Sequence, residues 1–300
     1  MENNKLNVGI IGGFQNGKST FVNCLLDGLV ARTGGEGVSA TSVNTKYVYG
    51  DVQSVTYLSS GREQKKVTLS EFIETKKFPD GTDEIIVSLW KPILKTINII
   101  DTPGFDANKK DTDMAIRSLN GIDVAIIIVN NKGLASVEKG IMKLMTQKHI
   151  PFFVLMNCTD QGGLRWFPKS EFNQNMLKEI GADIKAEYLT PVPINSFPIW
   201  VCNLQWFWYA IEHYQQETKE KIKDILDEIE NYKSKEQVKS KFKNISEKYF
   251  VEESNFLSLR QFFDDEKCWG FPLNCIRWQA SLDKTFGEWE NNLKTIINKF

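Results

Sequence analysis

The sequence lacks the features that mark several common classes of protein. Its five cysteines are scattered, and no C-x-x-C pair suggests a zinc or redox site, so reduced thiols in a cytoplasmic protein are the simplest interpretation. No apolar run reaches the ~18 residues that a transmembrane helix needs, and no secretory signal precedes the first apolar segment. The formal net charge is -1, without the basic excess of most nucleic-acid binders, so we expect no nucleic-acid partner.

A glycine-rich segment near the N-terminus is the strongest pattern present. Residues 12–19 fit G-x-x-x-x-G-K-[ST], with an apolar run before them and a helical pattern after them. In such a loop, backbone N–H groups and a helix N-terminus surround phosphate oxygens. The pattern predicts that Lys18 reaches the β- and γ-phosphates and that the Ser19 hydroxyl ligates Mg²⁺. The predicted phosphate-binding residues are Gly12, Gly13, Phe14, Gln15, Asn16, Gly17, Lys18, Ser19 and Thr20.

A second motif, D-x-x-G, spans residues 101–104 and follows an apolar segment of strand length. The carboxyl ends of such strands are where open α/β sheets place ligands. We expect Asp101 to hold Mg²⁺ through water and the Gly104 N–H to meet the γ-phosphate. In isolation the same four residues would fit an ordinary Asp-Pro-Gly turn, and the intact phosphate loop upstream favours the functional interpretation.

The third motif follows the apolar segment 151–156 and reads Asn157-Cys158-Thr159-Asp160, which resembles the guanine-reading N-K-x-D motif of GTPases. A carboxylate at Asp160 can accept both N1–H and N2–H of guanine, a pairing that adenine cannot offer. Cys158 replaces the usual lysine, whose stem packs along the base, so the motif favours guanine specificity more than affinity. Asn195 and Ser196 are weaker candidates for a last base-contacting loop.

Strand and helix patterns alternate over the first ~200 residues, and 41% of the 300 residues are hydrophobic. This order predicts an α/β, P-loop NTPase fold, a mostly parallel sheet with helices on both faces. The expected strands are 42–49, 52–58, 84–90, 94–100, 124–129, 151–156 and 188–194, and the expected later helices are 70–76, with Ser70 as N-cap, 136–148 and 170–180.

With these motifs in place, the chain resembles the GTPase domain of the dynamin superfamily, and the bacterial dynamin-like proteins in particular. Residues 41–50 are similar to that family's switch I, and residues 90–95 and 122–123 are similar to its flanking segments. The resemblance implies GTP and GDP as ligands, Mg²⁺ bound by Ser19, Thr41 and Asp101, and catalysis by Lys18, Thr41 and Gln15. Thr41 would then coordinate the metal and hold the attacking water.

One departure concerns how water is positioned. Ras-like enzymes carry a glutamine after the D-x-x-G glycine, and this chain has Phe105 there. Dynamin relatives use instead the fourth residue of the phosphate loop, which is Gln15 here. Two interpretations stay open: Gln15 orients a monovalent cation or the β–γ bridge, or it faces solvent until a partner arrives. Neither Arg32 nor Arg117, near the switch segments, is selected as an arginine finger by the sequence.

The remaining residues carry amphipathic helical spacing. We expect a G domain over 1–200 with a closing helix at 254–264, a helical insertion over 201–253, and a helix over 270–300 packing on the insertion as an appended helical bundle. Aromatic residues at 199–200 and 206–209 fit core packing better than a membrane-inserting or dimer surface.

The leading hypothesis is a Mg²⁺-dependent GTPase whose cycle drives a switch or self-assembly, as a homodimer through the nucleotide face and peripherally on a membrane. The alternative is a nucleotide-binding interaction module with little intrinsic hydrolysis, activated by a partner. A ribosome-assembly GTPase is a third, which the balanced charge of residues 204–300 does not support. The chain is too short for a full dynamin stalk, so it is a compact relative, one part of a complex, or a piece of a longer polypeptide.

Overall fold

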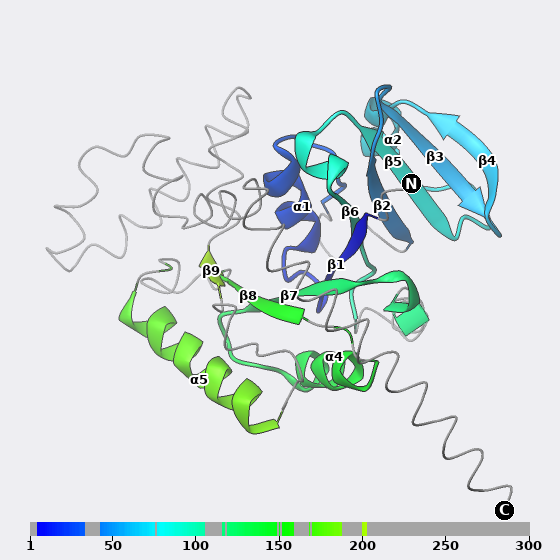
Figure 1. Cartoon of the computed structure of the whole chain (residues 1–300). Coiled ribbons are helices and arrows are strands. Elements are labelled where there is room, and N and C mark those ends of the chain that lie inside the picture. The colour runs from blue at the N-terminus through cyan, green and yellow to red at the C-terminus, as the bar shows by residue number, and fades with distance from the viewer. Residues whose placement is uncertain are drawn as a thin grey trace, which may run out of the picture.

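The computed structural model describes residues 5–33, 43–75, 77–105, 116–117, 119–148, 150, 152–158, 168, 170–187 and 200–202. In this part of the chain, nine strands form one sheet in the order β4-β3-β5-β2-β6-β1-β7-β8-β9 (Figure 1). The strands are β1 Leu6–Gly12, β2 Asn44–Tyr49, β3 Ser54–Ser59, β4 Arg62–Val67, β5 Glu84–Leu89, β6 Ile97–Asp101, β7 Val124–Asn130, β8 Phe152–Asn157 and β9 Trp200–Cys202. The α-helices are α1 Lys18–Leu26, α2 Leu69–Glu74, α4 Ser136–Gln147 and α5 Glu171–Glu187, with 3₁₀ turns η1 Pro92–Lys95 and η2 Leu119–Gly121.

The sheet is parallel in its centre and antiparallel toward one edge. Strand β1 runs parallel to β6 and β7, and β8 and β9 continue that direction. Strand β2 is antiparallel to β6, with Thr45 opposite Asp101, and β3 and β4 add a hairpin beyond β5. The residues of β7 are buried almost throughout, as expected of a strand covered on both faces. The predicted fold, a mostly parallel sheet of the P-loop NTPase type with helices on both faces, is confirmed.

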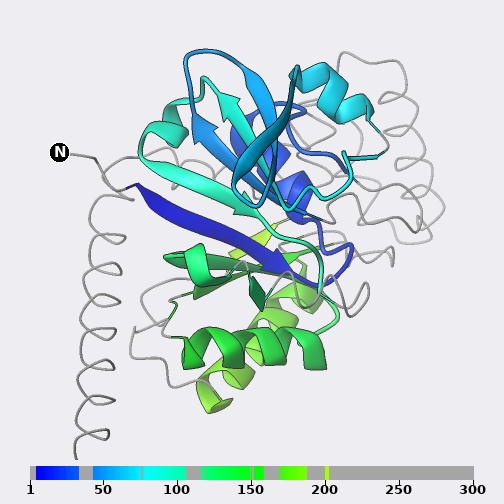
Figure 2. The ribbon, with the colours of Figure 1, turned by 90° about the vertical axis from the view of Figure 1, so that its right-hand side faces the viewer.

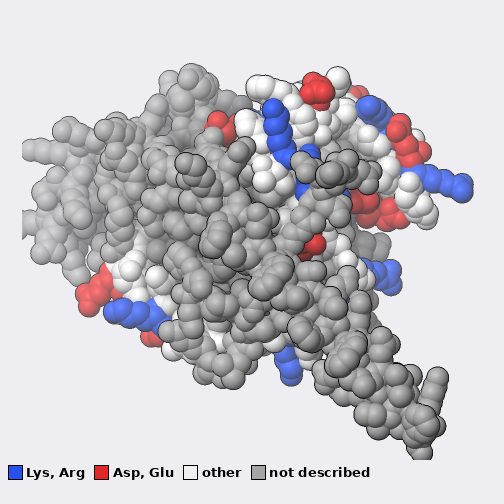
Figure 3. Space-filling model, viewed as in Figure 1, with Lys and Arg blue, Asp and Glu red and all other residues white. Residues whose placement is uncertain are grey.

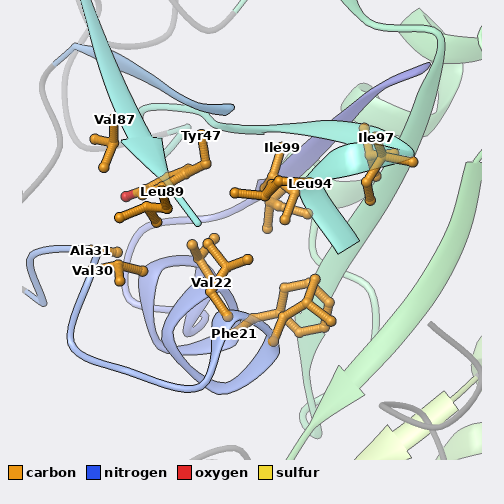
Figure 4. Close-up of a cluster of buried hydrophobic side chains, with 14 of the residues drawn as sticks. Phe21, Val22, Val30, Ala31, Tyr47, Val87, Leu89, Leu94, Ile97 and Ile99 are labelled. Carbon is orange, nitrogen blue, oxygen red and sulfur yellow. The ribbon is translucent and has the colours of Figure 1, made fainter. Parts of the chain in front are cut away.

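Two apolar clusters lie on opposite faces of the sheet. On one face, Phe21 and Val22 of α1 pack against Tyr47 of β2 and Ile99 of β6 (Figure 4). On the other face, Met142 and its neighbours on α4 pack with residues of α5 beneath β7 and β8. Figures 1 and 2 show α4 and α5 together on the side of the sheet away from α1. This arrangement fixes α1, and the loop that precedes it, at the carboxyl end of β1.

Several local predictions differ from the structure. The N-cap of α2 is Thr68 and not Ser70: Thr68 Oγ1 accepts from the Glu71 N–H at 3.2 Å, and Glu71 Oε2 accepts from the Thr68 N–H at 2.8 Å. This capping box satisfies two helix-end donors at once, which the single hydroxyl of Ser70 does not. Helix α5 continues to Glu187, seven residues past the predicted end.

Two strands were not predicted. Strand β4 reads Arg-Glu-Gln-Lys-Lys-Val and is exposed along all but its last residue, so it carries no apolar alternation. Its charged side chains are typical of an edge strand. Strand β9 pairs with β8, so the sheet runs to Cys202, two residues past the boundary placed at 200.

The expected strand at 188–194, the insertion beyond residue 202, the closing helix at 254–264 and the helix at 270–300 lie outside the described residues. Among the helices that are described, none combines the length and the apolar character needed to cross a bilayer.

Candidate functional site

The phosphate loop connects β1 to α1, which is the predicted strand, loop and helix arrangement. Two of its residues have left-handed backbones: Gln15 with φ 60° and Gly17 with φ 96°. Gly17 is also the N-cap of α1, so a residue that tolerates positive φ directly precedes the helix. A Cβ on Gly12 would lie 2.4 Å from the Ile128 carbonyl oxygen of β7, so only glycine fits that close approach. Gln15 itself is exposed.

Lys18 is buried in the first turn of α1, and its Nζ donates to the carbonyl oxygens of Gly12 at 3.2 Å and Gly13 at 2.9 Å. Burial lowers the pKa of this lysine, and the Asp101 carboxylate opposes that shift. A Cβ on Gly104 would lie 3.2 Å from Lys18 Nζ. The structure therefore places Lys18 of the first motif next to Gly104 of the second.

Ser19 and Asp101 are joined directly, because α1 and the end of β6 meet beside β1. Ser19 Oγ donates to Asp101 Oδ2 at 2.8 Å. Burial raises the pKa of Asp101 to about 6, against the opposing effects of Lys18 and of the Ser19 hydrogen bond. Within the described part of the chain, Asp101 Oδ1 is buried without a hydrogen-bond partner. A carboxylate with a free oxygen beside a hydroxyl fits a hard, oxygen-binding cation such as Mg²⁺.

The phosphate loop is also tied to the residue that follows Gly104. The Phe14 N–H donates to the Phe105 carbonyl at 3.1 Å, and the Phe105 N–H donates to the Gly12 carbonyl at 3.4 Å. The Phe105 ring is buried in the cluster that faces α4 and α5. The position that carries a glutamine in Ras-like enzymes is thus an apolar anchor in this protein.

Asn157 of the third motif lies at the end of β8, and its Nδ2 donates to the Asn16 carbonyl at 3.0 Å. The base motif and the phosphate loop therefore share a hydrogen bond. Cys158 is 2% exposed, and burial raises the pKa of its thiol well above the ordinary value. Its side chain belongs to the core and does not take the place of the lysine stem.

The remaining predicted residues separate into two groups. Phe14 and Thr20 are half-buried within the loop and the first turn of α1. The residues outside the described part are Thr41, Asp160, Asn195 and Ser196. Of the two arginines considered as fingers, Arg32 stacks its guanidinium over the Phe78 ring at 4.7 Å, whereas Arg117 is exposed.

One residue of this region was missed in the sequence. Glu138, in the first turn of α4, is 5% exposed and accepts from Asn16 Nδ2 at 3.0 Å. The only available signal was an acidic residue three positions into a predicted helix, which is ordinarily a solvent-exposed, dipole-stabilising position. Its contact with the phosphate loop depends on how α4 lies under β1 and β7.

The comparison with protein families agrees with this geometry. A family model described as the elongation factor Tu GTP binding domain matches residues 3–259. The chain belongs to this family. As a GTP-binding domain it binds GTP and GDP, and it is a GTP hydrolase. The phosphate loop, the D-x-x-G loop and the end of β8 lie within the matched range.

The sequence matches to individual relatives cover only part of the chain. Peptide chain release factor 3 of Lacticaseibacillus casei is 37% identical over 70 residues, which are 23% of this chain and 13% of that protein. The same factor from Lactobacillus acidophilus is 37% identical over 92 residues, 30% of this chain and 17% of the relative. The matched part of the GTP-binding domain thus spans less than a fifth of these relatives.

A solved structure matches nearly the whole chain. It is described as an oligomerised bacterial dynamin pair that provides a mechanism for the long-range sensing and tethering of membranes. The likeness covers 98% of this chain and 40% of the other, with a TM-score of 0.59 and 16% sequence identity. At that identity the likeness establishes the fold of the GTP-binding domain.

Proposed function

We propose that the chain is a dynamin-like GTPase in which hydrolysis of GTP to GDP and phosphate drives a switch or self-assembly cycle at a membrane surface. One observation carries the proposal: the likeness to a bacterial dynamin extends over 98% of the chain, whereas the release-factor matches end after 70 to 92 residues. That dynamin is described as oligomerised and as acting on membranes, and both properties are proposed here for this chain.

In this proposal each residue of the site has a separate role toward the nucleotide. Lys18, withdrawn from solvent and 2.9 Å from the Gly13 carbonyl, neutralises charge that develops on the transferred phosphoryl group. Ser19 and Asp101 would hold Mg²⁺, which supplies electrostatic stabilisation of the phosphate oxygens when bound. The Gly104 N–H would meet the γ-phosphate. Guanine recognition by Asn157, Asp160, Asn195 and Ser196, and positioning of the attacking water by Thr41, stay sequence-based parts of the proposal; of these residues Asn157 lies among the described ones.

The proposal also assigns activation to a second copy of the chain. Phe105 is buried in the core and offers no polar group to water, so the Ras-like arrangement is unavailable. Gln15 is exposed on the phosphate loop, where a facing copy or a monovalent cation can reach it. Intrinsic turnover is therefore slow, and a trans-acting group adds a factor on the order of 10³–10⁵.

The test is phosphate release from GTP and from ATP across a series of protein concentrations, with and without anionic vesicles and beside Lys18→Ala. Turnover of GTP alone, rising per molecule with concentration and lost in the variant, supports the proposal. Flat turnover at every protein and lipid concentration supports instead the interaction module with little intrinsic hydrolysis. Equal use of ATP would contradict the assignment of the base motif.

A translation role is the second candidate, because release factors are among the curated relatives that match part of the chain in sequence. The described residues give it little electrostatic support: on the face in Figure 3, Lys and Arg are interspersed with Asp and Glu. Adding ribosomes to the same phosphate-release assay distinguishes the translation role from the membrane role. Stimulation by ribosomes and not by vesicles or self-association would favour the translation role.

A further inference from the structure

A buried carboxylate lies directly behind the phosphate loop. Glu138 in the first turn of α4 is 5% exposed, and its Oε1 accepts a hydrogen bond from Asn16 Nδ2 at 3.0 Å. A Cβ built on Gly13 would lie 3.1 Å from both Glu138 Oε1 and Asn16 Nδ2. The pair therefore fills the space directly beneath the loop backbone, on the side away from solvent.

Asn16 connects the loop to three other elements. Its Nδ2 donates to Glu138 on α4 and also to the Ile128 carbonyl of β7 at 3.0 Å, and its carbonyl accepts from Asn157 of β8. Asn16 sits between Gln15 and Gly17, the two residues with left-handed backbones. Holding the Asn16 side chain therefore restrains the backbone turn that the phosphate-binding geometry needs.

The stability of the fold does not by itself explain a glutamate at position 138. Among the described residues, its Oε2 is buried with no hydrogen-bond partner. A buried carboxyl group with an unsatisfied oxygen costs free energy, and an apolar side chain of similar volume usually packs there as well or better. A carboxyl group offers no positive charge to phosphates, so Glu138 does not attract the nucleotide directly. Its hydrogen bond to Asn16 is the favourable interaction that remains.

We propose that Glu138 is a positioning residue that fixes the phosphate loop through Asn16 and so sets the affinity for the nucleotide. The inference rests on residues 12–20 being the nucleotide site. It predicts that two measurements separate: removal of the carboxyl group weakens nucleotide binding and leaves the nucleotide-free protein equally or more stable. If Glu138 served only the stability of the fold, its removal would lower both the nucleotide affinity and the stability of the nucleotide-free protein.

The experiment compares Glu138→Met, Glu138→Gln and the control Lys139→Ala by the affinity for GDP and by thermal unfolding without nucleotide. Lys139 is the next residue on α4 and pairs with Asp183 of α5, away from the loop. We expect Glu138→Met to weaken GDP binding about 10- to 100-fold, the range for losing a hydrogen bond to a charged group. Glu138→Gln keeps an acceptor for Asn16 and should stay within about threefold, and Lys139→Ala should leave GDP affinity unchanged.

A double-mutant cycle with Asn16→Ala shows whether the effect passes through Asn16. Affinity losses for the double variant no larger than for the greater single loss support the proposal, and additive losses overturn it. Unchanged affinity in Glu138→Met, or parallel losses of affinity and thermal stability, would overturn it too. If Glu138→Met does not fold, the same cycle is run with Glu138→Ala. Lys18→Ala marks the site itself: retained GDP binding there would mean that the site assignment, and not the role of Glu138, has failed.

Discussion

Ser19 Oγ donates a 2.8 Å hydrogen bond to Asp101 Oδ2, across 82 positions of the sequence. This contact brings the phosphate loop and the D-x-x-G loop together before any ligand is considered. It leaves Asp101 Oδ1 buried and without a partner among the described residues. A hydroxyl and a carboxylate with a free oxygen form the local chemistry of the proposed Mg²⁺ site.

The first prediction concerns these two residues. Ser19→Ala and Asp101→Asn each remove one proposed ligand, and we expect the Mg²⁺ concentration needed for half-maximal GTP turnover to rise at least about 10- to 100-fold. Ser136→Ala is the matched control, since Ser136 is an exposed serine in the first turn of α4. Mg²⁺ titrations of phosphate release provide the measurement. An unchanged midpoint in both variants would place the metal elsewhere.

Metal affinity should also depend on pH through Asp101. The pKa of this carboxyl is raised from 3.8 to about 6, so protonation competes with the cation below about pH 6. We expect Mg²⁺-dependent nucleotide affinity to fall by up to about tenfold per pH unit below that value. Without Mg²⁺ the sign reverses: the folded state holds this proton more tightly, so stability through this group increases as pH falls from 7 to 4.

The Asp101→Asn variant isolates both effects. Its Mg²⁺-dependent nucleotide affinity should lose the pH dependence between pH 5 and 7. In unfolding experiments without Mg²⁺, the wild type should gain about 2–3 kcal/mol relative to the variant between pH 7 and pH 4. A stability difference that stayed constant over this range would mean that Asp101 has an ordinary pKa in the folded state.

Gly104→Ala should impair turnover through a small displacement. A Cβ there would lie 3.1 Å from Phe14 Cα and 3.2 Å from Lys18 Nζ, and the Phe14 N–H is held by the Phe105 carbonyl. We expect GTP turnover to fall about tenfold or more, because small misplacements at reacting groups are costly. Gly140→Ala is the contrast: Gly140 is exposed in α4, and a Cβ there would meet nothing within 4 Å beyond the adjacent backbone of its own helix. The variant should gain about 0.5–1 kcal/mol with unchanged turnover.

Phe105→Gln should not restore a Ras-like mechanism. The ring lies in the apolar cluster with residues of α4 and α5, so a glutamine there buries an amide and loses apolar contacts. We expect the free energy of unfolding to drop by about 2–4 kcal/mol, without faster GTP turnover. Phe105→Leu keeps an apolar side chain and should cost less than about 1.5 kcal/mol. Faster turnover in Phe105→Gln would show that the side chain can turn toward the nucleotide.

Much of the local geometry of the candidate site could be predicted because its signals are local. The phosphate loop has glycine at Gly17, where φ is positive, and at Gly12, where β7 approaches, and both positions appear directly as residue types at fixed spacing. Asp101 and Asn157 follow apolar segments of strand length, and parallel strands place such ends along one edge of the sheet. The apolar run of β7 predicted a strand buried on both faces for the same reason.

Other elements carried weaker or misleading local signals. Strand β4 has no apolar alternation, because as an exposed edge strand it packs little against the core. The N-cap of α2 is Thr68 and not the predicted Ser70, because the reciprocal hydrogen bonds between Thr68 and Glu71 satisfy two backbone donors. Residue type alone does not rank two hydroxyl side chains that lie two positions apart in the sequence. From the sequence, Phe105 indicates only that the glutamine of Ras-like enzymes is absent. The structure shows that its ring packs in the apolar core.

The sequence by itself determined which residues can form a phosphate loop and a mostly parallel sheet, because backbone conformation and strand burial depend on residue type over short spans. Only the tertiary structure decided that Asp101 keeps a free oxygen beside Ser19, that Arg32 is engaged by Phe78, and that Glu138 reaches Asn16 under the loop. These relationships join residues far apart in the chain. They depend on how strands and helices pack across the sheet, which local residue patterns do not specify.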